Sequence, residues 1–125
     1  MTPATLILRQ VHPSFVQEGR VTSQAFRPTP KDDKKLSAYH GDKVTPAQSW
    51  EHFTQQPDCK SAGVMAASHA ECIAKELPVE ADGIPFPEHV SIDFSQYEEN
   101  DIKKKAKLLA RDADARGWLH RQQTE

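Results

Sequence analysis

Four short stretches of the chain are rich in β-branched and aromatic residues and alternate apolar with polar positions, which is typical of strands. The first covers residues 5–12 and should end before Pro13, because the residue before a proline favours extended geometry. Residues 21–26, 36–39 and 90–94 form the other three. The pattern therefore predicts a sheet assembled from strands that are far apart in the sequence.

Helices are predicted where a Ser or Thr is followed three residues later by Glu or Gln, a pattern that caps the first turn. Such boxes begin at Thr45, Ser68 and Ser95. The third box precedes the clearest helix, Gln96 to Arg116, which should end at Gly117. Its apolar residues recur at helical spacing and predict one buried stripe formed by Ile102, Ala106, Leu109 and Ala113.

The middle of the chain allows two interpretations. Residues 63–67 are predicted to form a buried strand that leads into the helix beginning at Ser68. The alternative is one alanine-rich helix over residues 62–77, which composition alone leaves open. Residues 77–87 contain three prolines and one glycine and are predicted to be a connector within the domain.

Together these elements predict a single α+β domain over residues 1–125, a length typical of one domain. Its sheet is expected to be small, mixed but mostly antiparallel, and to have about four or five strands. The long C-terminal helix should pack on one face of that sheet. The order of the strands stays open.

Charge is distributed unevenly along the chain, although the net charge is only −2. Residues 1–43 carry +3, residues 44–101 carry −9 and residues 102–125 carry +4. A pI near 6.3 makes nucleic acid an unlikely partner. No apolar stretch approaches the roughly 20 residues of a membrane helix, and no signal peptide is visible. With only two cysteines, we expect a cytoplasmic protein with free thiols.

Five polar residues beside the first two predicted strands form the candidate binding site: Arg9, His12, Arg20, Ser23 and Arg27. An arginine within an apolar strand must reach the rim of the sheet or meet an anion, because burying an unpaired charge is costly. The set is therefore predicted to bind a phosphate or carboxylate. The alternative is that these arginines lie on solvated faces or pair with the acidic middle segment, as surface arginines commonly do.

The Arg/Pro-rich N-terminal segment that contains these five residues favours a non-enzymatic binding or accessory protein. Such a protein would use this segment to recognise a protein partner or a small anionic ligand. The alternative is a small enzyme acting on a phosphate-bearing, nucleotide-like substrate. An Arg on one strand followed by a Thr-Ser strand is similar in residue types to ADP-ribosyltransferase-like folds, which hold a nicotinamide dinucleotide with such residues. No glutamate stands in a recognisable catalytic motif, so catalytic residues are not assigned and enzymatic activity stays open.

Six histidines and two cysteines raise the question of a metal site. Only His69 and Cys72 are close in sequence, and no second pair completes a set of four ligands. The sequence also lacks a glycine-rich phosphate loop and a dinucleotide fingerprint. We therefore expect neither a metal nor a cofactor.

Overall fold

The computed structural model describes residues 1–28 and 33–122, and a six-stranded antiparallel sheet organises that part of the chain. The strand order is β6-β7-β4-β1-β5-β8. The strands are β1 (Leu6–Val11), β4 (Lys35–His40), β5 (Gly63–Ser68), β6 (Val79–Glu80), β7 (His89–Asp93) and β8 (His120–Arg121). A separate hairpin contains β2 (Val16–Gln17) and β3 (Arg20–Val21).

The predicted α+β class is confirmed, with a mostly antiparallel sheet and a long C-terminal helix. The sheet has more strands than the expected four or five because β6 and β8 join its two edges. Each of these strands is only two residues long. Two residues are too few to show an alternating pattern, so the sequence gives no sign of either strand.

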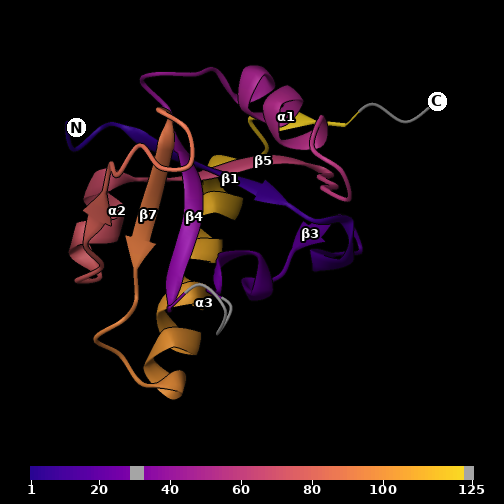
Figure 1. Cartoon of the computed structure of the whole chain (residues 1–125). Helices are drawn as coiled ribbons and strands as arrows, with labels where there is room; N and C mark the ends of the chain where they lie inside the picture. The colour runs from indigo at the N-terminus through magenta and orange to yellow at the C-terminus, as the bar shows by residue number, and fades with distance from the viewer. Residues whose placement is uncertain (29–32, 123–125) are drawn as a thin grey trace.

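Helices cover the sheet on both sides. In Figure 1 helix α3 (Glu99–Arg116) lies behind the sheet, α1 (Pro46–Thr54) lies at its upper end and α2 (His69–Ala74) lies at its left side. Successive residues of β1 point to opposite faces, so Ile7 joins the hydrophobic cluster under α3. Leu8 joins the cluster on the opposite face, together with Trp50 of α1.

Helix α3 buries the predicted stripe, because all four of its residues are at most 8% exposed. It ends at Gly117, whose φ of +89° is readily adopted only by glycine. The start differs from the prediction, since the helix begins at Glu99 and Glu98 caps it without a side-chain bond. The amide of Ser95 instead donates to the Asp93 carboxylate, so residues 95–97 form a turn after β7.

The capping boxes at Thr45 and Ser68 are confirmed, each with both reciprocal hydrogen bonds. The second box also decides between the two interpretations of the middle segment. Residues 63–68 form the fully buried strand β5, which pairs on both sides within the sheet, and the helix begins only after Ser68. The alternative of one helix over residues 62–77 is therefore wrong.

The predicted strand over residues 21–26 is wrong for most of its length. Strand β3 ends at Val21, and a 3-10 helix, η2 (Ser23–Phe26), follows it. Ala25 and Phe26 of η2 are fully buried in the cluster under α3. Burial of this short helix has overridden the intrinsic β preference of the segment. The charged residues 31–35 are typical of a solvated loop. Of these, residues 31–32 lie outside the described part of the chain, and Lys35 begins β4.

Candidate functional site

A cleft opens where β1 and β4 diverge. The two strands are in register only at Ile7–His40 and Leu8–Tyr39, whereas β1 and β5 pair at six positions. Figure 1 shows β1 and β4 crossing at a steep angle. Arg9 lies at this divergence, where its Nε donates to the Ala25 carbonyl (2.7 Å) and its Nη1 donates to the Ser37 carbonyl (2.8 Å).

The cleft has a volume of about 180 Å³. Helix α1 and the loop before β7 contribute walls, and the strands contribute the floor. The lining residues are Arg9, Gln10, Ser37, Ala38, Tyr39, Phe53, Gln56, Pro85, Phe86 and His89. We call it the aromatic cleft, because three of these residues are Phe or Tyr. None of the ten residues is a carboxylate.

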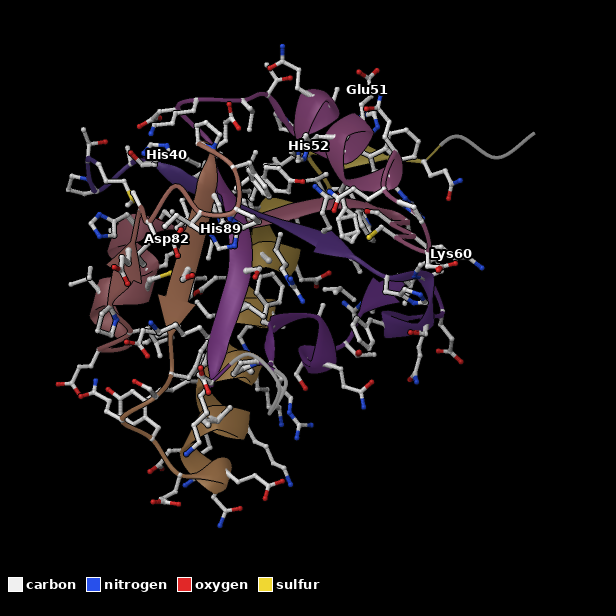
Figure 2. All side chains as sticks on the ribbon, viewed as in Figure 1. His40, Glu51, His52, Lys60, Asp82 and His89 are labelled. Atoms are coloured by element: carbon white, nitrogen blue, oxygen red, sulfur yellow. The ribbon has the colours of Figure 1, made fainter. Side chains whose placement is uncertain are left out.

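A histidine–aspartate pair stands at the wall of the aromatic cleft. His89 Nδ1 and the Asp82 carboxylate are 2.6 Å apart, and the second Asp82 oxygen accepts from the Ser91 hydroxyl at 2.8 Å. His89 is only 8% exposed. Figure 2 shows Asp82 and His89 side by side, with His52 on α1 across from them and Lys60 far away. The pair forms because the loop between β6 and β7, which carries Asp82, folds back onto β7, which begins at His89.

The charge of Asp82 is favoured by these contacts. Partial burial alone would raise its pKa, but the hydrogen bonds from His89, Ser91 and the Ile84 amide outweigh it and lower the pKa below the ordinary value. The carboxylate is therefore ionised at neutral pH. As an acceptor only, it requires His89 to hold a proton on Nδ1.

Aromatic rings hold the loop against the sheet. Phe86 stacks on Tyr39 with ring centroids 4.9 Å apart and meets the edge of His89 at 5.3 Å. Phe86 also contacts His52 of α1 at 4.6 Å. The backbone of the loop is fixed as well, because the His40 amide donates to the Glu88 carbonyl at 2.8 Å. These contacts connect three chain segments at one end of the cleft.

Tyr39 presents a neutral phenol to this site. Its hydroxyl lies 2.8 Å from His52 Nδ1. Burial, with smaller contributions from Cys59 and Glu88, raises the pKa of Tyr39 to about 12. Tyr39 is also the direct cross-strand partner of His89, so their side chains are neighbours on one face of the sheet.

Helix α1 is fixed above the aromatic cleft by a buried polar network. The Gln10 amide donates to the Ser49 hydroxyl at 3.0 Å and accepts from the Ser61 hydroxyl at 2.8 Å. Ser49 is the one fully buried residue among those of α1. Because every polar atom of this network is paired, it positions Phe53 of the same helix, and Gln56 just after the helix end, at low cost.

The structure places the five sequence-predicted site residues in several locations. Arg9 lines the aromatic cleft. Arg20 and Ser23 line a second cleft beside α3. His12 accepts from the Ser14 amide and caps the short 3-10 helix η1 (Pro13–Phe15), and the lining of neither cleft includes it or Arg27. The structure thus brings Arg20 and Ser23 together and separates them from Arg9.

Sequence reasoning missed Asp82 and His89. Asp82 lies in the proline-rich stretch that was predicted to be a connector, and His89 stands one residue before the predicted strand. The only available signal was the alternation of β7, which places His89 and Ser91 on one face. That alternation does not reveal which loop residue folds onto this face.

No known family model matches this chain, and comparison with curated proteins and with solved structures also found no match. Across residues 1–28 and 33–122, no three His, Cys, Asp or Glu residues are grouped so that they could hold a metal ion. No helix of this described part is long and apolar enough to span a bilayer.

Proposed function

We propose that the protein binds a small one-ring acid in the aromatic cleft and that His89 accepts a proton from it. The observation that carries this proposal is the 2.6 Å contact between His89 Nδ1 and the Asp82 carboxylate, in a histidine that lines the cleft. A carboxylate behind an imidazole fixes its tautomer and stabilises its protonated form.

The proton arrives at Nε2 of His89. With Nδ1–H donated to Asp82, the neutral ring has its lone pair on Nε2. Within the described residues the His89 side chain forms its hydrogen bond through Nδ1, and Nε2 is not one of the buried polar atoms that lack a partner. In the transfer, the O–H bond of the ligand breaks and an N–H bond forms at Nε2, leaving an imidazolium–carboxylate pair.

The size and lining of the aromatic cleft support a small one-ring acid as its ligand. A cavity of about 150 Å³ holds one benzene ring, so about 180 Å³ suits one ring with a small substituent. Tyr39, Phe53 and Phe86 offer apolar ring contacts. The guanidinium of Arg9, held in the wall by the Ala25 and Ser37 carbonyls, favours the anion that remains after proton transfer.

The test uses 4-nitrophenol, whose ionised form is recognised by its visible absorbance. We expect saturable binding that raises the phenolate fraction above that in buffer of the same pH. The His89→Gln variant should lose this gain, and His69→Gln, which changes a histidine outside the cleft lining, should retain it. No saturable absorbance change in the unaltered protein, or an equal change in His89→Gln, would contradict the proposal.

Two other functions stay proposals. Recognition of a protein partner or anion by the N-terminal segment is supported in so far as Arg20 and Ser23 share a cleft. Action on a nucleotide-like substrate by all five predicted residues has less geometric support, because Arg9 lies in the other cleft. We also propose a cytoplasmic location, with which the two free thiols of Cys59 and Cys72 agree.

A further inference from the structure

A second cleft lies between η2, the β2–β3 hairpin and α3. Its volume is about 350 Å³, nearly twice that of the aromatic cleft. The lining residues are Arg20, Val21, Ser23, Lys107, Ala110, Arg111 and Asp114. We call it the basic cleft. Its four α3 residues have the spacing i, i+3, i+4 and i+7, so they form one continuous helix face.

Positive charge exceeds negative charge in this cleft. Arg20, Lys107 and Arg111 face one carboxylate, Asp114. The ion pair between Arg20 and Asp114 is 4.0 Å long, and its side chains are 80% and 46% exposed. An exposed pair at this distance is weak, so the pair leaves Arg20 able to contact a ligand.

We propose that the basic cleft binds a phosphate monoester. Two guanidinium groups from different elements match the oxygens of a phosphate as paired donors, and a lysine adds a point charge. The Ser23 hydroxyl supplies a neutral hydrogen-bond donor at the same place. The volume exceeds what one ring requires and leaves room for the group that carries the phosphate.

This site is independent of the aromatic cleft. The two linings have no residue in common. Ala38 of the aromatic cleft does belong to the same hydrophobic cluster as Ala110, and Arg9 bonds to the Ala25 carbonyl in η2, but neither Ala38 nor Arg9 lines the basic cleft. Failure of one proposal therefore does not decide the other.

The test measures binding of inorganic phosphate and of glucose 6-phosphate by calorimetry and by shifts of backbone amide resonances. We expect saturable binding of the ester, weaker binding of inorganic phosphate, and shifts centred on Arg20, Ser23 and Arg111. Arg20→Gln and Arg111→Gln should each weaken ester binding by about tenfold, which corresponds to one charge-assisted hydrogen bond. Equal binding of inorganic phosphate and glucose 6-phosphate would mean that the cleft contacts only the phosphate group, which would contradict a monoester site.

A matched control separates a site from general attraction of anions. Lys103 lies one turn before Lys107 on α3 and pairs with Glu99 at 3.5 Å, outside the cleft lining. Lys103→Gln removes the same charge and should leave ester binding unchanged, while Asp114→Asn should strengthen it. No saturable binding, or an equal loss in Lys103→Gln and Arg111→Gln, would overturn the proposal.

Discussion

At the scale of single residues, the Asp82 carboxylate is the acceptor that organises the aromatic cleft. It receives hydrogen bonds from His89 and Ser91 on neighbouring positions of one strand face. Replacing it with Asn, which has one acceptor oxygen and no charge, leaves part of this network unpaired. We expect Asp82→Asn to lower the free energy of unfolding at neutral pH by about 1–3 kcal/mol, measured by urea denaturation.

The effect of this variant should depend on pH. The folded state lowers the pKa of Asp82 below its ordinary value of 3.8, so the ionised group stabilises the fold above that pH. This contribution is lost as the pH falls through the lowered pKa. The difference in unfolding free energy between the unaltered protein and Asp82→Asn should therefore narrow below about pH 4. A difference in unfolding free energy that stays constant down to pH 2 would contradict the claim that the ionised Asp82 carboxylate stabilises the fold.

Tyr39 gives the corresponding prediction at alkaline pH. Its pKa is raised from 10.0 to about 12 in the folded state, so its neutral form stabilises the fold and this contribution is lost as the pH rises from 10 toward 12. The Tyr39→Phe variant lacks this titration. Its stability should fall less steeply over that range than the stability of the unaltered protein, as measured by urea denaturation. If the unfolding free energies of the two proteins fell in parallel with pH, the raised pKa of Tyr39 would be contradicted.

Sequence reasoning selected Arg9 as a candidate because an arginine in an apolar strand needs polar partners. Its partners include the backbone carbonyls of Ala25 and Ser37, which become available because β1 and β4 diverge. His89 could not be identified in this way. A histidine next to a strand is common, and its significance depends on Asp82, seven residues earlier in a loop whose path the sequence does not specify.

At the scale of elements, the two adjacent leucines of α3 have opposite environments. Leu109 is fully buried and Leu108 is 41% exposed. We expect Leu109→Ala to lower the free energy of unfolding by about 2–5 kcal/mol, because it leaves a cavity under the sheet. Leu108→Ala should change it by no more than about 0.5 kcal/mol. Similar losses in urea denaturation of the two variants would contradict the orientation of α3.

Periodicity predicted this helix well because its apolar stripe is long and regular. The capping boxes predicted two of three helix starts, since at Thr45 and Ser68 the local hydrogen bonds and the tertiary packing agree. At Ser95 they do not agree, because the preceding Asp93 side chain accepts the Ser95 amide and extends the turn. Residues 21–26 show the same limit, since burial of Ala25 and Phe26 decides their conformation.

At the scale of the whole molecule, the sheet separates two hydrophobic clusters with one tryptophan packed against each. Trp118 packs on the cluster under α3, and Trp50 packs on the cluster under α1. If residues 1–125 form one domain, both layers should unfold together. Fluorescence of the Trp50→Phe and Trp118→Phe variants, each compared with its own far-ultraviolet circular dichroism, should give coincident urea transitions. Separate midpoints within either variant would indicate two units.

The same architecture explains where these two clefts form. The aromatic cleft forms where two central strands diverge under α1, and the basic cleft forms where the N-terminal hairpin meets α3. Both positions depend on contacts between segments far apart in the sequence. The fold class was therefore predictable from local patterns, whereas the grouping of the candidate site residues was not.

The proposed proton-accepting role of His89 is tested most directly by the ring nitrogen resonances of the histidines, recorded with and without 4-nitrophenol and assigned with single His→Gln variants. Without the ligand, we expect His89 to carry its proton on Nδ1 and a lone pair on Nε2. On binding, the Nε2 resonance of His89 should move to the position of a protonated nitrogen. A bound ligand that leaves the His89 resonances unchanged, or that protonates another histidine instead, would contradict this role.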